Sequence, residues 1–211
     1  MSASPVRNVV FDVGGVLLDW NPQRVLAQFY PDAELRRHVG AALFGGADWS
    51  DFDRGTLSEA DLLAALSTRA GRPAPELGDL FLALRHSLTP KTDTLRLLET
   101  LHLRGVPLYC LSNMSDSIYA HLAGQHGFWA RFQGIVISGQ IQLLKPERAI
   151  YEYLVTRYHL NASETLFLDD IEANVIGARA AGLQALQFHD AADAQRQLAP
   201  LLGQTREAPS D

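Results

Sequence analysis

The stretch VVFDVGGVLLDW, residues 9–20, places Asp12 at the end of an apolar run and follows it with Gly14 and Gly15. Apolar side chains on consecutive residues suit a strand that is buried on both faces, as in a parallel sheet. An aspartate that ends such a strand has no helix to cap, and glycines let a ligand approach the backbone closely. The stretch therefore predicts a buried first strand with a functional carboxylate at its end.

Beyond this stretch, short apolar runs alternate with segments of helical periodicity. We expect strands at 7–13, 106–112, 134–138, 165–170 and 183–188, and helices at 91–104, 115–126, 146–158, 171–181 and 191–202. This alternation is typical of a parallel α/β sheet. The predicted fold class is α/β, with a Rossmann-like parallel sheet as its core.

One interval after the first strand breaks the alternation, because it carries helical spacing without a convincing strand. We expect four helices there, at 22–30, 33–43, 58–70 and 75–88, with turns that include FGGAD (44–48) and DRG (53–55). The sequence thus predicts two domains. These are an α/β core of residues 1–16 and 90–211, and a helical cap of residues 17–89 inserted after the first strand.

The composition and charge of the chain argue against several classes of function. The chain has 211 residues and a formal net charge of −6, with scattered Lys and Arg, which argues against nucleic-acid binding. No apolar run approaches the ~20 residues that span a bilayer, and residues 1–8 lack the build of a signal peptide. We expect a cytoplasmic monomer or homodimer with a small-molecule partner, no nucleic acid and no membrane, and a frayed C-terminal TREAPSD.

Polar residues stand at the predicted strand ends, where open parallel sheets bind ligands. They are Asp12 after the first strand, Ser112 and Asn113 after the second, Lys145 between the third and its helix, and Asp169 and Asp170 after the fourth. Each pair alone has a plainer interpretation as a helix cap, and Lys145 alone as a solvated lysine. Together they predict one polar cluster at one edge of the sheet.

Converging carboxylates repel one another unless a cation lies among them. Mg²⁺ fits, because it takes one or two protein carboxylates, waters and a phosphate oxygen. Lys145 and donors from Ser112 and Asn113 would then meet the remaining phosphoryl oxygens. The cluster therefore predicts a phosphoryl-transfer site.

Four ordered motifs carry a resemblance to a known family. They are FDVGGVLLD (11–19), LSN (111–113), KPE (145–147) and FLDDIEANVIGARAAG (167–182). With the helical insert, they resemble the haloacid dehalogenase (HAD) superfamily, in particular its capped phosphatases, from Val6 to about His189. The branch acting on sugar phosphates such as α-glucose 1-phosphate is similar in its non-acidic residue at Gly14 and in a WxxFxxG-like stretch, here WSDFDRG (49–55).

The resemblance implies a Mg²⁺-dependent phosphatase acting on a small phosphorylated metabolite, a sugar phosphate. Asp12 would attack phosphorus and form an aspartyl phosphate. Ser112 would hydrogen-bond the phosphoryl group, and Lys145 would pair with both that group and Asp12. The Mg²⁺ ligands would be Asp12, the backbone carbonyl of Gly14, and one or both of Asp169 and Asp170. Asn174, often acidic in the family, would support the loop.

Gly14 departs from the family pattern. Most phosphatases of the family have an aspartate at this position, which protonates the leaving oxygen and later activates water. Such acid–base help is commonly worth ~10²–10⁴-fold. Asp19 or His86 could replace it, a water chain could relay the proton, or the substrate could need little protonation. We hypothesise a bias toward anomeric, acyl or aryl phosphates. In the cap, Trp49 and Asp53 are candidate sugar contacts.

Two alternatives remain open. A 2-haloacid dehalogenase also uses an aspartate nucleophile without a second aspartate, but it needs no metal and gains nothing from a paired Asp169 and Asp170. A binding module without turnover would not need the nucleophile and lysine. Magnesium dependence separates the phosphatase from the dehalogenase.

Overall fold

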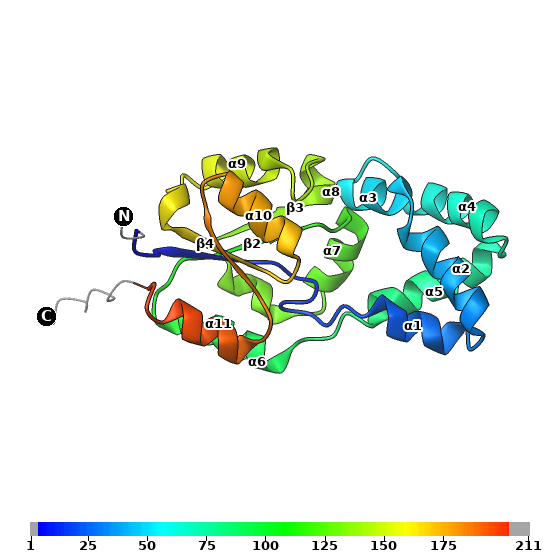
Figure 1. Cartoon of the computed structure of the whole chain (residues 1–211), viewed down its shortest axis with the longest axis horizontal. Coiled ribbons are helices and arrows are strands. Elements are labelled where there is room, and N and C mark those ends of the chain that lie inside the picture. Colours follow the sequence, from blue (N-terminus) through cyan, green and yellow to red (C-terminus); the bar gives the residue numbers. More distant parts are fainter. Residues whose placement is uncertain (1–3, 203–211) are drawn as a thin grey trace, which may run out of the picture.

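The computed structural model describes residues 4–202, so the predicted TREAPSD tail lies outside the described residues. Its core is a five-stranded sheet (Figure 1). The strands are β1 (Asn8–Phe11), β2 (Leu108–Ser112), β3 (Gly134–Ile137), β4 (Thr165–Asp169) and β5 (Gln184–Gln187). All neighbours pair in parallel in the order β3-β2-β1-β4-β5. The predicted α/β fold class is confirmed, and β1 lies at the centre of the sheet.

Helices cover both faces of this sheet. α6 (Thr92–Leu103) and α11 (Ala191–Leu198) lie on one face, and α9 (Arg148–Arg157) and α10 (Glu172–Ala180) on the other (Figure 1). Shorter elements complete the core: α7 (Asp116–Ala123), α8 (Ser138–Ile141), η1 (Gly127–Arg131) and η2 (Ala162–Glu164). No helix between residues 4 and 202 has the length and apolar character that crossing a membrane requires.

The two faces explain why β1 is apolar from Val9 to Phe11. Val10 packs in one buried cluster with Ile150 of α9, whereas Phe11 belongs to the cluster that contains Leu98 of α6. Alternate residues of a strand point to opposite faces, so a segment covered on both sides favours apolar side chains at consecutive positions. The apolar run therefore ends only where the strand leaves the sheet, at Asp12.

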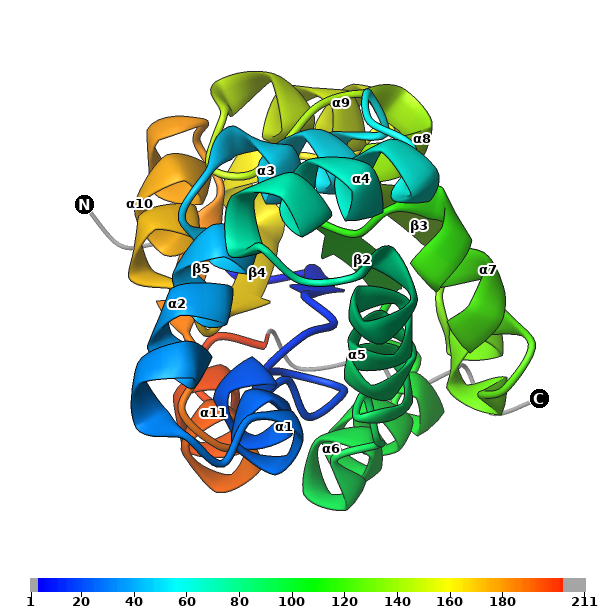
Figure 2. The same ribbon diagram turned by 90° about the vertical axis from the view of Figure 1, so that its right-hand side faces the viewer.

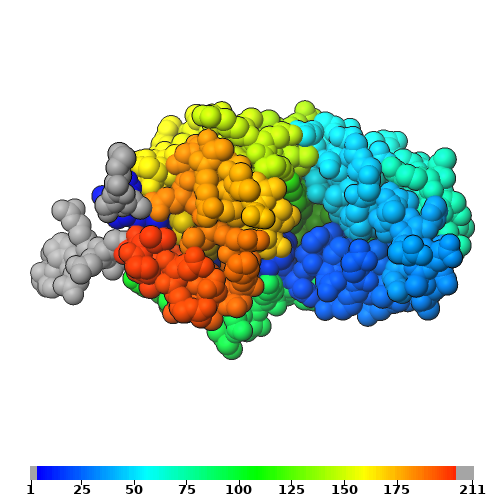
Figure 3. Space-filling view, in the orientation of Figure 1, coloured from blue at the N-terminus to red at the C-terminus, as the bar shows by residue number. Residues whose placement is uncertain are grey.

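Five helices form the cap. They are α1 (Pro22–Phe29), α2 (Ala33–Phe44), α3 (Ala47–Arg54), α4 (Glu59–Ala70) and α5 (Ala74–His86). Viewed from the end of the molecule, they stand in front of the sheet (Figure 2). In the space-filling view, the blue and cyan cap meets the core along a continuous seam (Figure 3). The cap therefore covers one end of the α/β core.

Helix α3 departs from the prediction of four cap helices. The predicted turns FGGAD and DRG bracket it, and its first residue follows Gly46, which provides no side-chain cap. Tertiary packing supports the helix, because Phe52 is buried against Phe81 with ring centroids 5.3 Å apart. It ends at Gly55, whose φ of 79° is the left-handed conformation that terminates many helices.

The two connections between core and cap run side by side. Leu18 and Pro90 form an antiparallel bridge. Beside it, the N–H of Asp19 donates to the carbonyl of Thr89 at 2.7 Å. Because the first connection follows β1 and the second is paired with it, the cap is tethered next to Asp12.

Candidate active site at the carboxyl end of the sheet

The structure brings the predicted polar residues together at one edge of the sheet. Asp12 follows β1, and Asp169 and Asp170 stand at the end of β4, the strand paired with β1. A cavity of about 270 Å³ lies here between core and cap. Its polar lining consists of Asp12, Asp53, Ser112, Asn113, Lys145 and Asn174, with Gly14 beside them. Its apolar lining consists of Trp20, Trp49, Leu88, Met114, Ile118 and Ile171.

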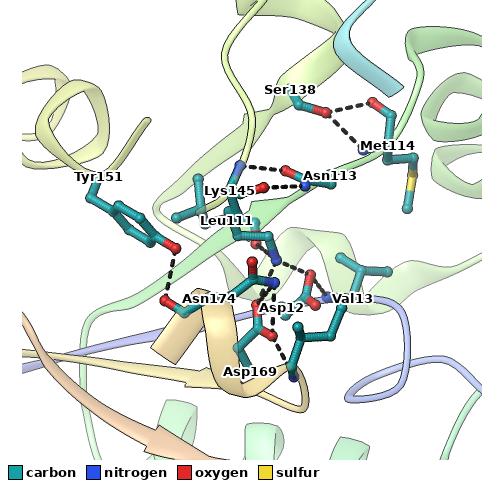
Figure 4. Close-up of polar contacts among 11 residues, drawn as sticks. Asp12, Val13, Leu111, Asn113, Met114, Ser138, Lys145, Tyr151, Asp169 and Asn174 are labelled. Carbon is teal, nitrogen blue, oxygen red and sulfur yellow. Dashed lines mark hydrogen bonds and ion pairs between the residues drawn. The ribbon is translucent and has the colours of Figure 1, made fainter. Parts of the chain in front are cut away.

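Lys145 is the buried cation of the cluster. Its Nζ lies 2.8 Å from Oδ1 of Asp12 and 2.7 Å from Oδ2 of Asp169, and it also donates to the carbonyl of Leu111 (Figure 4). Burial opposes its charge, but the two carboxylates outweigh this effect and raise the pKa of Lys145. Lys145 is therefore a fixed positive charge.

Asp12 is oriented by two donors on the same oxygen. Its Oδ1 accepts the N–H of Val13 at 2.7 Å and the ammonium of Lys145, whereas Oδ2 accepts no hydrogen bond from residues 4–202 (Figure 4). Burial raises the pKa of Asp12 to about 7 against the attraction of Lys145, and the carboxylate of Asp169 adds to the rise. One oxygen is thus anchored while the other stays available.

Asp169 is saturated by hydrogen bonds. Its Oδ1 accepts the N–H of Ile171 at 2.8 Å, and Nδ2 of Asn174 lies 3.0 Å from each carboxylate oxygen. The hydroxyl of Tyr151 donates to the backbone carbonyl of Asn174 at 2.8 Å, which fixes the backbone that carries this amide (Figure 4). With Lys145 on Oδ2, Asp169 is locked in position by its neighbours.

Asp170 has a different environment from its neighbour in sequence. Its Oδ1 is buried without a hydrogen-bond partner among the described residues. Burial and the Asp169 carboxylate raise the pKa of Asp170. A Cβ at Gly15, where φ is 76°, would lie 2.2 Å from Oδ2 of Asp170. The glycine therefore makes room for this carboxylate, which explains one of the two glycines after Asp12.

The three carboxylates fit a hard divalent cation. Asp12, Asp169 and Asp170 each offer an oxygen within 4.8 Å of the others. One ammonium, that of Lys145, faces these carboxylates, so two negative charges remain in excess. The unpartnered oxygen of Asp170 adds a ligand that nothing else in the described residues uses. All of these donors are oxygens, as Mg²⁺ prefers.

The Asn113 side chain, which the sequence suggests as a phosphate donor, lines the cavity and is engaged by the backbone of Lys145. Its Oδ1 accepts the N–H of Lys145 at 2.8 Å, and its Nδ2 donates to the carbonyl of the same residue at 2.9 Å (Figure 4). The amide thus clamps the backbone that presents the lysine. Ser112 is buried and lines the cavity, as a phosphoryl donor would.

Neither proposed substitute for the acid missing at Gly14 reaches the cavity. Asp19 is paired with Arg24 at 2.8 Å, and the His86 ring lies against that of His121. Neither Asp19 nor His86 is among the residues that line the cavity. Gly14 does line it, and a Cβ there would meet only Trp20, at 3.7 Å. The missing side chain is therefore not excluded by space.

A carboxylate from the cap enters the same cavity. Asp53, near the end of α3, lines it together with Asp12 and Gly14. Burial raises the pKa of Asp53 to about 7, although a hydrogen bond from Trp49 and the charge of Lys145 act in the opposite direction. The sequence identifies Asp53 as a candidate sugar contact, but it contains no signal for this altered acidity, which depends on closure of the cap over the core.

The chain is similar to known proteins over nearly its whole length. A family model of haloacid dehalogenase-like hydrolases matches residues 6–182. A sesquiterpene phosphatase of Aspergillus oryzae is 29% identical over 93% of this chain and 97% of its own length. A phosphoglycolate phosphatase of Vibrio parahaemolyticus is 26% identical over 86% of this chain and 83% of its own length.

A solved structure shows the same fold. It is a HAD-family enzyme of Bacteroides thetaiotaomicron in complex with magnesium and inorganic phosphate, 20% identical in sequence, with a TM-score of 0.72. The match covers 87% of this chain and 94% of that one. From the family model that spans most of its length, this chain belongs to the haloacid dehalogenase-like hydrolases.

Proposed function

We propose that the protein is a Mg²⁺-dependent phosphatase that hydrolyses a small phosphorylated metabolite through an aspartyl phosphate on Asp12. The observation that carries this proposal is the arrangement around Asp12, whose Oδ1 is anchored while Oδ2 is free beside a cavity. Two relatives that match along most of their length are phosphatases by name, which supports the reaction class.

The residues of the site have separate roles in phosphoryl transfer. Oδ2 of Asp12 attacks phosphorus, so that a bond from this oxygen to phosphorus forms as the bond to the leaving oxygen breaks. Lys145 and Ser112 hold the phosphoryl oxygens as charge develops. Water then attacks phosphorus, releases phosphate and restores the Asp12 carboxylate.

Asp12, the backbone carbonyl of Gly14 and Asp170 would hold Mg²⁺. When bound, the ion supplies positive charge that offsets the excess of carboxylates and the charge of the phosphoryl group. Asp169 instead positions Lys145, because its oxygens already accept four hydrogen bonds or ion-pair contacts. The free oxygen of Asp170 supports this division.

The cavity lining favours a substrate with an apolar body. Six of the residues around it are apolar, and the Trp20 and Trp49 rings stack with centroids 6.0 Å apart. The Aspergillus relative acts, by its name, on sesquiterpene phosphates. A sugar 1-phosphate remains the prediction from the sequence, and Asp53 is the one cap carboxylate in the lining that could accept a hydrogen bond from a sugar hydroxyl.

A substrate screen tests this proposal. It compares an isoprenyl monophosphate, glucose 1-phosphate and glucose 6-phosphate, each with Mg²⁺ and with EDTA, using Asp12→Asn as the control. We expect Mg²⁺-dependent phosphate release that is lost in the variant, and the highest kcat/KM for the isoprenyl compound. Activity toward a 2-haloacid in EDTA would establish the dehalogenase instead. Faster turnover of glucose 6-phosphate than of glucose 1-phosphate would contradict the bias expected from Gly14.

A further inference from the structure

The C-terminal end of α3 is fixed to the core next to the active site. Oγ of Ser138, the first residue of α8, donates to the carbonyl of Asp53 at 2.6 Å. Arg54 forms a two-pronged ion pair with Glu147, and a Cβ at Gly55 would lie 2.3 Å from the carbonyl oxygen of Gly139. These contacts join cap to core at Asp53 and at the two residues that follow it, so the position of Asp53 over the cavity is set by the core.

The charges around Asp53 leave its carboxylate unpaired. Lys145 is the charged group that acts on it electrostatically, and the ammonium of Lys145 is already shared between Asp12 and Asp169. Arg54, the next residue, is committed to Glu147. On the cap side, Arg69 of α4 is paired with Asp48 of α3. Asp53 thus has no ion-pair partner among the described residues.

This half-buried carboxylate shares the cavity with the nucleophile and with a glycine that has no side chain to act on a proton. Hydrogen bonds from Trp49 and from the N–H of Ser115 reach this carboxylate, but no cation of residues 4–202 pairs with it, and a buried charge without a counter-charge costs free energy. Its placement is explained if a proton has to be moved at this point of the cavity.

We propose that Asp53 is the general acid and base of the reaction, supplied by the cap in the place where residue 14 offers no side chain. The inference rests on the proposed phosphatase activity. In the first step, Asp12 bonds to phosphorus, the bond to the leaving oxygen breaks, and the proton of the Asp53 carboxyl passes to that oxygen. In the second, Asp53 takes a proton from the water that attacks phosphorus, and the bond between phosphorus and Asp12 breaks.

The pKa of about 7 supports this role, because a carboxyl near neutrality both gives and takes a proton efficiently. An ordinary exposed aspartate would be almost fully ionised at pH 7. Since burial produces this shift, the role also requires the cap to be closed over the core when the leaving group departs.

The test compares leaving groups in wild-type and Asp53→Asn enzyme. An alkyl phosphate requires protonation of its leaving oxygen, whereas p-nitrophenyl phosphate releases a stable anion. Since kcat/KM reports formation of the aspartyl phosphate, we expect it to fall about 10²–10⁴-fold for the alkyl substrate. For p-nitrophenyl phosphate we expect little change in kcat/KM, with a lower kcat because water attack is slowed.

Asp51→Asn is the matched control, because it removes the same charge from α3 at a position that does not line the cavity. We expect it to behave as wild type with both substrates, and thermal unfolding reports whether each variant is folded.

Equal losses of kcat/KM for both substrates in Asp53→Asn would overturn the proposal and assign Asp53 to substrate binding. No loss for either would also overturn it. If wild-type enzyme turned over neither substrate with Mg²⁺, the proposed phosphatase activity itself would have failed.

Discussion

Asp169 and Asp170 are adjacent in sequence, but their side chains have different environments and therefore different roles. Asp169 accepts hydrogen bonds on both oxygens and holds Lys145, whereas an oxygen of Asp170 is buried without a partner among the described residues. A pair of aspartates after a strand therefore does not contribute two equivalent metal ligands. One carboxylate completes the polar network, and the other keeps an oxygen free for the proposed cation.

Substituting these residues singly separates the two roles. We expect Asp170→Asn to raise the Mg²⁺ concentration for half-maximal activity about tenfold or more, since even residues behind the ligands affect metal affinity by 10–100-fold. Asp169→Asn should lower the free energy of unfolding by about 3 kcal/mol, because it breaks a buried ion pair. Mg²⁺ titrations and denaturant unfolding measure these effects. A larger Mg²⁺ effect in Asp169→Asn would reverse the assignment.

Asp53 also predicts a dependence of stability on pH. Folding raises its pKa from 3.8 to about 7, so the folded chain binds more protons than the unfolded chain between these values. Its contribution to stability therefore declines as pH rises through this window and stays unfavourable above pH 7. Lys145 is the charged group facing it, and the nearby Arg54 and Arg69 are paired with acids.

Asp53→Asn removes this cost, so it should stabilise the metal-free protein at pH 8 and much less at pH 4. The expected gain is on the order of 1 kcal/mol, about 2–4 °C in Tm for a chain of this size. Thermal unfolding at both pH values measures it, with Asp51→Asn as the comparison. An equal change of Tm at the two pH values would contradict the shifted acidity.

For single residues, the sequence predicts which side chains lie at the site better than it predicts what those side chains contact. The strand-end rule locates Asp12, Lys145 and the paired aspartates, because parallel strands deliver their ends to one edge. It does not reveal that the Asn113 amide holds the backbone of Lys145, a contact between residues 32 positions apart in the chain. The acidity of Asp53 depends likewise on the core that covers it.

Helix α3 shows how one short element links the domains. It is an eight-residue helix without a side-chain N-cap, and its C-terminal glycine lies against α8 of the core. Strands such as β1 are predictable because burial on both faces leaves a continuous apolar run. Helix α3 is not, since its stability comes from packing of Phe52 and contacts with the core rather than from its own periodicity.

Two glycines that end cap helices provide a matched test of this docking. Gly55 after α3 and Gly71 after α4 both have positive φ, at 79° and 62°. A Cβ at Gly55 would clash with the backbone of Gly139, whereas one at Gly71 would meet nothing within 4 Å among the described residues. Alanine therefore strains both helix ends by roughly 1–2 kcal/mol, but only at Gly55 does it push the helix off the core.

We expect Gly55→Ala to lower kcat/KM about tenfold or more, because small misplacements of catalytic groups are costly. Gly71→Ala should lose stability while it keeps kcat/KM close to wild type. Steady-state kinetics with p-nitrophenyl phosphate and with an alkyl phosphate, at equal fractions folded, check the comparison. Equal kinetic losses in the two variants would show that docking of α3 has no particular role.

At the scale of the whole molecule, the cap and core together build a single site. The core supplies Asp12, Lys145 and the carboxylates of Asp169 and Asp170, and the cap supplies Asp53 and much of the apolar lining. The predicted insertion of a helical cap after the first strand explains this division, since it tethers the cap beside Asp12. The extent of each domain, 17–89 for the cap, stays a prediction that limited proteolysis can examine.

An assembled site should also respond as a unit to an analogue of the phosphorylated aspartate. We expect Mg²⁺ with beryllium fluoride to raise the Tm of the wild-type protein, because a ligand that binds the folded state stabilises it. Neither component alone should match this effect, and Asp12→Asn should abolish it. An unchanged Tm would favour the binding module without turnover.

The proposed mechanism requires Asp12 to carry the phosphoryl group during turnover. Its direct test is to mix enzyme, Mg²⁺ and a phosphorylated substrate, quench in acid within one turnover, and analyse the peptides by mass spectrometry. We expect the peptide containing Asp12 to gain the mass of one phosphoryl group, and EDTA to prevent this gain. Phosphate release without any modified Asp12 peptide, or a phosphoryl group on another residue, would contradict it.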